Sequence, residues 1–268
     1  MIARGIVISI ALFTATACSR KPPAVVKASA PPVQTWGTLR EVMHEGNVGP
    51  KVVLRNVMVP HLYGVGALVG LSGEVAIVDG KAFVARADGN SAVVAPAPEA
   101  TAATLLVAAA VSGWINFPLQ QPVGSSRELD AVVESAARKA GLDLEQPFPF
   151  LVIGKVDARW HVLRGQPGHA GGGHAAHLRN AITGRLSDTA ATVIGFFSRH
   201  HEGVFTHMGE RSHLHVISDD ASTMGHVDDI AMPAGATLKL PRKSSNRRVS
   251  PVRIMDFTVA RLEAWRGR

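Results

Sequence analysis

The sequence predicts an α+β protein, because many short strand patterns are accompanied by only two clear helix patterns. The strand patterns are short apolar or β-branched runs that glycine-rich turns separate, and they do not alternate with helices as βαβ units would. Hydrophobic residues make up 46% of the 268 residues, which allows a sizeable core and excludes wholesale disorder. There is no short internal repeat, so a solenoid is not expected.

The N-terminal 35 residues are expected to lie outside the folded body. Arg4 precedes an apolar run from Gly5 to Ala17, which is shorter than the roughly 20 residues that a membrane-spanning helix needs. A charged start, a short apolar run and small residues before a cut site are typical of a signal peptide, here residues 1–17. Small residues directly before Cys18 resemble a bacterial lipobox, so we expect Cys18 to be lipidated. Ordinary cleavage, which would leave Cys18 as a free N-terminal thiol, is the alternative.

These N-terminal features also predict where the protein acts. Residues 18–35 are rich in Pro and Ala and suit an extended tether between a membrane and the body. We therefore expect an exported lipoprotein that its lipid holds on the membrane, facing the periplasm or the extracellular side. The single cysteine also excludes an internal disulfide framework and a zinc site made of several thiolates.

The C-terminal segment 241–268 is predicted to be a distinct basic tail. Residues 239–268 hold nine basic and two acidic residues, so the net charge of +7 belongs to this end of the chain. The tail either rests on an anionic membrane surface or packs on the body as a terminal strand or helix. Nucleic acid is not an expected partner, because an exported chain would not meet it and aromatic residues do not interleave with the basic ones.

Residues 36–240 are expected to form the body, and the break at Gln146-Pro147 allows a division into two sub-domains near residue 145. Helices are expected over Trp36–Glu45 and over Ser126–Ala140, the second with a serine cap and Gly141 as its stop. Asp79-Gly80 signals a hairpin, Asp88-Gly89 a second turn and Asp157-Ala158 a third. The expected strands are Val52–Val59, Leu62–Leu71, Glu74–Asp79, Val84–Arg86, Thr104–Val111, Phe150–Val156, Trp160–Leu163, Thr192–Phe197, Val204–His207 and His213–Ser218.

Three of the twelve histidines are predicted to bind a metal ion. His213 and His215 lie two residues apart on an expected strand, so their side chains project from the same face. His226 follows a turn through residues 219–225 and can return to the same place. Three imidazoles suit a tetrahedral divalent metal with one open position, and imidazole favours Zn, Cu, Fe or Ni over Mg or Ca. A half-exposed histidine pair without a metal is the alternative.

The other nine histidines are not assigned to this site. His169, His174 and His177 lie in a Gly- and Ala-rich loop and are interpreted as surface residues. His44, His61 and His161 are treated as structural. We interpret the last three, His200, His201 and His207, as exposed residues or strand ends.

The histidine segment resembles a known family. His213-Leu214-His215 followed by Gly225-His226-Val227 is similar to the zinc-binding segment of α-acetolactate decarboxylases, which reads His-Leu-His, an apolar stretch with acidic residues and then Gly-His-Val. A second block, Tyr63–Ala67 with Leu71–Val75 and Val78–Gly80, resembles the family's Gly-Leu-Gly-Thr, Leu-Asp-Gly-Glu-Leu and Leu-Asp-Gly pattern. A third, weaker match places Arg164 on the family's active-site arginine. The resemblance covers roughly residues 36–232, and the tail has no visible counterpart.

Two departures from the family's pattern stand out. Ala67 occupies the place of the family's threonine, which removes a hydroxyl group from near the expected site. The family also has a second carboxylate late in the chain, and Glu263, the only late glutamate here, has a different context. Both departures bear on the range of substrates and on the rate.

The resemblance implies an α+β fold with mixed and antiparallel β-sheets, in a family that is often dimeric, so a homodimer is one expected state. It implies His213, His215 and His226 as zinc ligands, with Glu74 and Arg164 as the polar catalytic pair. The implied reaction is the zinc-dependent decarboxylation of 2-acetolactate, or a close 2-hydroxy-3-oxo acid, to acetoin and CO2. Glu74 would act as acid and base, and Arg164 would pair with the departing carboxylate or stabilise developing charge.

Two other functions remain open at this point. A different zinc enzyme, such as a hydrolase, could use the same scaffold, because zinc with an open position also activates water. A non-catalytic envelope protein could keep the site to capture a metal or a ligand. Ester hydrolysis without turnover of acetolactate would favour the first, and tight binding without conversion would favour the second.

Overall fold

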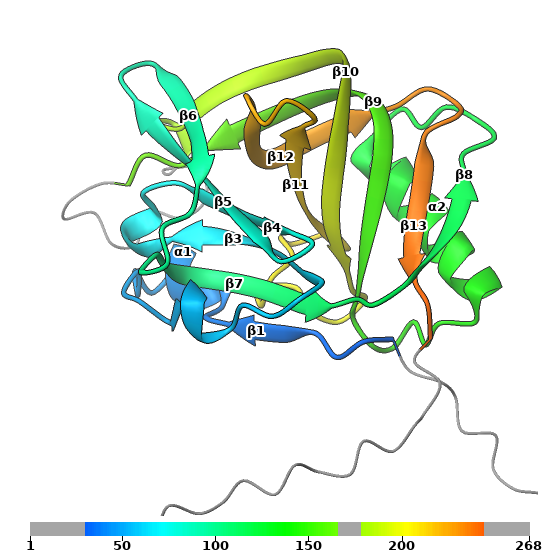
Figure 1. Ribbon diagram of the computed structural model, residues 1–268, viewed down its shortest axis with the longest axis horizontal. Helices are drawn as coiled ribbons and strands as arrows, with labels where there is room; N and C mark the ends of the chain where they lie inside the picture. Colours follow the sequence, from blue (N-terminus) through cyan, green and yellow to red (C-terminus); the bar gives the residue numbers. More distant parts are fainter. Residues whose placement is uncertain (1–29, 166–177, 244–268) are drawn as a thin grey trace, which may run out of the picture.

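The computed structural model describes residues 30–165 and 178–243, which form two β-sheets and two α-helices (Figure 1). The predicted signal peptide, Cys18 and most of the tether lie outside the described residues, as do His169, His174, His177 and the tail beyond residue 243. Within the described ranges, no helix is long and apolar enough to cross a membrane. The α+β class is confirmed, and every strand pairing within the two described sheets is antiparallel.

The first sheet comes from the N-terminal half of the described chain and has the order β1-β7-β3-β4-β5-β6, with β2 also paired to β7. Its β4–β5 hairpin turns at Asp79-Gly80, where φ is 48° and 76°. Both values lie in the left-handed region that tight two-residue hairpins require, so the predicted hairpin is confirmed. The strands are β1 (Gln34–Trp36), β2 (Val52–Val53), β3 (Leu62–Leu68), β4 (Glu74–Val78), β5 (Lys81–Asp88), β6 (Ser91–Pro96) and β7 (Ala102–Ala110).

The second sheet has the order β10-β11-β12-β9-β13-β8. The long strand β9 also pairs with β10, so β9, β10, β11 and β12 form a closed ring of antiparallel pairings. Closure satisfies the backbone groups of these four strands and gives their side chains fixed directions. The strands are β8 (Trp114–Pro118), β9 (Phe148–Val162), β10 (Ile182–Phe197), β11 (Ser212–Ser218), β12 (Met224–Ala231) and β13 (Thr237–Pro241).

The longer helix, α2 (Ser126–Ala140), has the ends that the sequence predicts. The Ser125 hydroxyl accepts the N–H of Glu128, and Gly141 ends the helix with a φ of 68°. Its apolar face packs against the second sheet, as the common core of Leu129, Val133, Phe148 and Phe150 demonstrates. The shorter helix, α1 (Leu39–Met43), begins after Thr38, whose hydroxyl accepts the N–H of Glu41.

The second sheet is packed on both faces. Phe150 and Val152 of β9 belong to the core shared with α2, while Leu151 between them packs with the first sheet. The inner core combines Val65, Ala76 and Val107 of the first sheet with Ile194 and Ile217 of the second. Strands β9 to β12 are therefore held between α2 and the first sheet, in the arrangement of Figure 1.

Several predicted elements differ from the structure. Trp36 lies in β1, and the helix begins only at Leu39. The strand predicted at Val52–Val59 stops after Val53 and continues as a 3-10 helix, η1 (Leu54–Asn56), and η2 (Val69–Leu71) likewise replaces the end of the predicted strand Leu62–Leu71. The strand predicted at Val204–His207 is not formed: residues 203–205 form a turn, and Thr206 makes only an isolated bridge with Glu202.

The turn predicted at Asp157-Ala158 is absent because β9 runs through it. Ala158 pairs with Leu186 of β10 on one edge and with Ile230 of β12 on the other. Pairing on both edges outweighs the local turn preference of aspartate. The chain passes from the first sheet to the second between β7 and β8, and the predicted domain boundaries stay predictions.

Candidate metal centre

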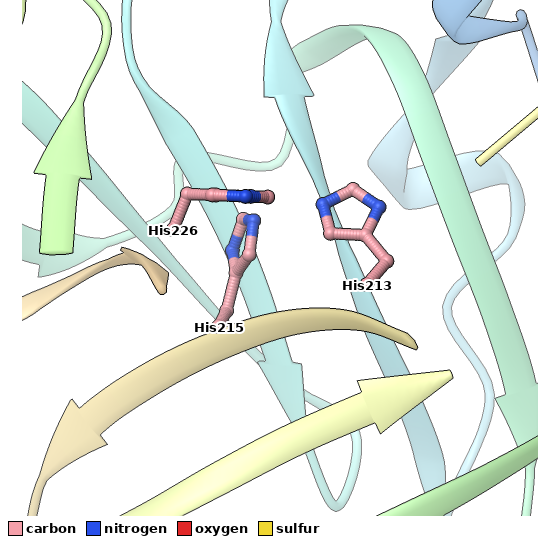
Figure 2. A group of neighbouring side chains, drawn as sticks. All are labelled: His213, His215 and His226. Carbon is pink, nitrogen blue, oxygen red and sulfur yellow. The ribbon is translucent and has the colours of Figure 1, made fainter. Parts of the chain in front are cut away.

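The three predicted metal ligands come together on two neighbouring strands. His213 and His215 lie on β11 and His226 on β12, and all three are at most 8% exposed. One ligand atom from each ring lies within 4.8 Å of those of the other two. Figure 2 shows the three rings gathered at one place. The period-two spacing of His213 and His215 and the return of His226 are therefore present as predicted.

The register of the β11–β12 hairpin brings His226 directly opposite His215. Its turn is fixed by Asp220, whose Oδ1 accepts hydrogen bonds from the Ser218 hydroxyl at 2.6 Å and from the Ser222 N–H at 3.0 Å. A slip of one residue would turn His215 to the opposite face of the sheet, so the turn protects the site.

The three predicted ligand histidines are held in the neutral form that can bind a metal. Burial lowers the pKa of His215 to about 3, and burial followed by neighbouring histidines lowers the pKa values of His213 and His226 well below the usual range. Both ring nitrogens of His215 and Nδ1 of His213 are buried without a hydrogen-bond partner in the described residues. Unpartnered buried nitrogens are costly, and a bound cation would satisfy them. The residues therefore fit a divalent metal ion such as zinc, which coordinates imidazole readily.

Glu74 is the carboxyl group of the site. It begins β4 of the first sheet and is 2% exposed, with Oε1 accepting the Leu163 N–H at 3.2 Å. Its Oε2 lies 3.7 Å from Nε2 of His215. Burial raises the pKa of Glu74 to about 7, and the opposing effects of His161 and the Leu163 N–H are smaller. Glu74 is therefore poised to hold and release a proton near neutral pH.

Two further histidines border the site, and sequence reasoning missed both. His161 of β9 pairs directly across the strands with His226, with 4.8 Å between the ring centroids, and its Nδ1 lies 2.7 Å from Oδ1 of Asp228. His207 lies in the turn after β10, and its ring centroid is 5.5 Å from that of His226. The surrounding apolar strand residues were the one available signal that His161 is buried. Only the pairing of β9 with β12 shows which residue it meets.

A cavity, which we call the histidine cavity, lies beside Glu74, His161, His207, His213 and His226. Ala67, at the place of the family's threonine, lies in its wall, so the departure bears directly on the site. The described residues that line the cavity are Leu39, Met43, Gly66, Ala67, Glu74, Leu105, His161, Leu163, His207, His213 and His226. Among these, every polar side chain is a histidine or Glu74.

Arg164 does not line the histidine cavity. Its guanidinium is exposed and donates hydrogen bonds to the carbonyl of Gly89 and to the side chain of Asn90, in the turn between β5 and β6. It lines a separate pocket with Asn90 and Arg179. The structure thus brings Glu74 and the three histidines predicted as metal ligands together and leaves Arg164 apart from them. The role predicted for Arg164 stays a prediction, and Glu263 lies outside the described residues.

Three neutral imidazoles with a buried, proton-holding carboxyl group beside them form an arrangement that metal-dependent enzymes use. The chain belongs to the alpha-acetolactate decarboxylase family, whose model matches residues 37–264. It is therefore a carboxy-lyase. The match extends beyond the roughly 36–232 covered by the residue patterns and reaches into the basic tail. A search of curated proteins found no match.

Solved structures share this fold. The alpha-acetolactate decarboxylase of Bacillus subtilis strain 168 is 15% identical with a TM-score of 0.65, covering 78% of this chain and 85% of that chain. The enzyme of Bacillus subtilis subspecies spizizenii is 16% identical with a TM-score of 0.66, covering 79% and 86%. A Staphylococcus aureus protein of unknown function, described as similar to alpha-acetolactate decarboxylase, is 19% identical with a TM-score of 0.64, covering 78% and 84%. At these identities the likeness establishes the fold.

Proposed function

We propose that this protein catalyses the zinc-dependent decarboxylation of 2-acetolactate, or a close 2-hydroxy-3-oxo acid, to acetoin and CO2. The observation that carries the proposal is the buried group of His213, His215 and His226 beside Glu74. Membership of the family supports the reaction type. The buried ring nitrogens of His213 and His215 that make no hydrogen bond in the described residues support the metal.

The three histidines would hold zinc beside the histidine cavity, which His213 and His226 line. Zinc bound there would supply a Lewis acid that polarises oxygen atoms of the substrate. The protein's own contribution is to keep the imidazoles neutral through burial and fixed in position, because β11 and β12 are two of the four strands in the closed ring. Apolar wall residues such as Leu105 and Leu163 would exclude water and strengthen every charge interaction inside.

Glu74 is proposed as the acid and base. Loss of CO2 from 2-acetolactate leaves an electron pair on the carbon that carried the carboxylate, and a proton must return to that carbon to give acetoin. With a pKa of about 7, Glu74 holds a proton in an appreciable fraction of molecules at neutral pH. Arg164 remains the predicted partner of the departing carboxylate. Its present contacts with Gly89 and Asn90 would have to break for it to reach the substrate.

The test is a measurement of CO2 and acetoin with purified protein and one equivalent of zinc. We expect release well above the spontaneous rate, loss of this release after chelation, and recovery when zinc is returned. A metal analysis of the same samples should give one zinc per chain. No turnover above the spontaneous rate in zinc-loaded, folded protein would contradict the proposal.

We also propose that the chain is exported and anchored through a lipid on Cys18. The support is the N-terminal pattern of Arg4, the apolar run and the small residues before Cys18. Metabolic labelling with a radioactive fatty acid should label the wild-type chain and not Cys18→Ser. Labelling of neither chain would contradict the anchor. Whether the protein forms the homodimer that the resemblance implies can be read from its mass in solution.

A further inference from the structure

We propose that a basic surface pocket, which we call the arginine pocket, binds a small organic anion through carboxylate or phosphate oxygens. The pocket lies between α2 and the turn that leads into β11, and its volume of about 480 Å³ is in the range of small-molecule sites. It shares no lining residue with the histidine cavity, so the inference does not depend on the proposed function. The described residues that line it are Arg127, Asp130, Ala131, Glu134, Arg138, Gly209 and Arg211.

The spacing along α2 gathers charged side chains on one stripe of the helix. Residues 127, 130, 134 and 138 follow one another at intervals of three or four, so they lie on the same side. Arg211 adds a third arginine from the turn before β11. Three arginines therefore face two acidic residues, and the lining of the pocket carries an excess of positive charge.

Arg127 is the arginine of the pocket that has no acidic partner. It is exposed and forms no ion pair within the described residues. Asp130, the nearest acidic residue on its stripe, binds the start of β11 instead: Oδ1 accepts the Ser212 hydroxyl, and Oδ2 accepts the backbone N–H of Arg211 at 3.2 Å. The guanidinium of Arg127 therefore keeps its donors, in the fork geometry that carboxylate and phosphate oxygens fit.

Glu134 holds the other two arginines of the pocket in place. Its carboxylate accepts one terminal nitrogen of Arg138 and one of Arg211. The Glu134 side chain is 10% exposed, whereas the side chains of Arg138 and Arg211 are 60% and 52% exposed. The carboxylate thus lies beneath guanidinium groups whose remaining donors face outward. Because groups that are already fixed lose little entropy when a ligand binds, these ion pairs preorganise the pocket for an anion.

Two other surface pockets contain arginines, and they provide a control and a competitor. In the first, two arginines, Arg185 among them, face two aspartates, so an anion gains little there. In the second, Arg164 and Arg179 face no acidic side chain among the described lining residues, so this pocket could also attract an anion. Arg185 is therefore the control, and Arg179 is the competitor that the experiment must separate from Arg127.

The position of the arginine pocket predicts a second effect of a bound anion. Gly209 and Arg211 belong to the turn between β10 and β11, and this turn also carries His207 to the histidine cavity. An anion bound between α2 and this turn would hold the two together and make local opening rarer. The backbone amides of residues 209–211 should therefore exchange more slowly with solvent deuterium when the anion is bound.

The experiment measures the binding of succinate and of inorganic phosphate to zinc-loaded protein by calorimetry, and the two arms distinguish a carboxylate ligand from a phosphate ligand. We expect Arg127→Gln to weaken binding about tenfold, the effect of one charge-assisted contact of roughly 1.4 kcal/mol. Arg127→Lys, which keeps the charge but not the fork, should recover part of the affinity. Arg185→Gln should bind as the wild type does, and uncharged succinamide should not bind.

Further variants separate the arginine pocket from other anion sites. His215→Ala, which lacks a predicted zinc ligand, should bind the anion as tightly as the wild type. An unchanged affinity in folded Arg127→Gln, or a loss of affinity in Arg179→Gln or His215→Ala instead, would overturn the proposal. Absence of binding by both anions, or exchange at residues 209–211 that the bound anion does not slow, would also overturn it. None of these readouts needs turnover, so CO2 release tests the proposed function separately.

Discussion

Glu74 and Glu134 are two buried glutamates in opposite electrostatic surroundings. Glu74 is 2% exposed, and Glu134, on α2, is 8% exposed. Glu134 forms ion pairs with Arg138, Arg199 and Arg211, the second at 2.6 Å. Glu74 instead accepts the Leu163 N–H and lies beside the imidazole of His215, and within the described residues no arginine or lysine forms an ion pair with it.

The two carboxyl groups differ accordingly in pKa. Burial raises the pKa of Glu74 to about 7. Burial acts in the same direction on Glu134, but hydrogen bonding and charge from Arg199, together with Arg138 and Arg211, outweigh it and lower the pKa. A buried carboxyl group surrounded by guanidiniums stabilises the fold as a permanent anion, whereas one without them can exchange its proton. Burial alone therefore does not identify a catalytic residue. The neighbouring charged groups determine whether a buried carboxyl group stays ionised or can exchange its proton.

The largest expected effect comes from removing a predicted metal ligand beside Glu74. His215→Ala removes the most buried ligand and should abolish both zinc binding and CO2 release, because two imidazoles do not complete the site. Elemental analysis and turnover are measured on the same sample. His200→Ala, in an exposed histidine that contacts Glu145, is the control and should keep both. Full zinc content in His215→Ala would show that the metal lies elsewhere.

Glu74→Gln should keep the fold and the zinc but lose proton transfer. General acid–base groups contribute about 10²–10⁴-fold to rates, so we expect a fall in kcat of that order. Thermal unfolding should be little changed, because a neutral amide replaces a carboxyl group that is half protonated near pH 7. Wild-type turnover in this variant would remove Glu74 from the chemistry.

Glu134→Gln should lower stability and leave catalysis unchanged, the reverse of what we expect for Glu74→Gln. It leaves three arginines around a neutral amide, and we expect a loss of about 1–2 kcal/mol in the free energy of unfolding, discounted because the arginines are partly exposed. Chemical denaturation measures it, and kcat should stay at the wild-type value. If instead kcat falls while stability holds, the distinction between the two glutamates is wrong.

The smallest expected effect concerns the exposed carboxylate of Asp220. Hydrogen bonds from Ser218 and Ser222 lower its pKa to about 2. A lowered folded-state pKa stabilises the fold above the unfolded-state pKa, and this contribution disappears as the pH falls from about 4 through the folded-state value of about 2. Asp220→Asn should therefore be slightly less stable than wild type at pH 7 and approach it below pH 2. Melting curves at both pH values measure the difference. The same difference in melting temperature between the two proteins at both pH values would exclude this linkage.

Local patterns in the sequence predicted part of this site. The spacing of His213 and His215 placed both on one strand face, and Asp79-Gly80 and Ser125 with Gly141 marked a hairpin and a helix correctly. These features depend on neighbours in the chain, where backbone preferences act directly.

Features that depend on pairing between distant segments were not predictable. His161 meets His226 only because β9 pairs with β12, and the bulge at Asp228 follows from that register. For the same reason the sequence suggested a turn at Asp157-Ala158, where pairing on both edges keeps β9 extended. The position of Arg164 depends on where β9 ends against the β5–β6 turn, which its own sequence does not specify.

The most direct test of the account is a crystal structure of the zinc-loaded protein with anomalous diffraction data collected on both sides of the zinc edge. We predict one strong peak about 2.0–2.1 Å from a ring nitrogen of each of His213, His215 and His226, with Glu74 beside it. The peak should be absent in crystals of His215→Ala grown under the same conditions. A zinc ion bound elsewhere, or no peak between the three rings, would contradict the account.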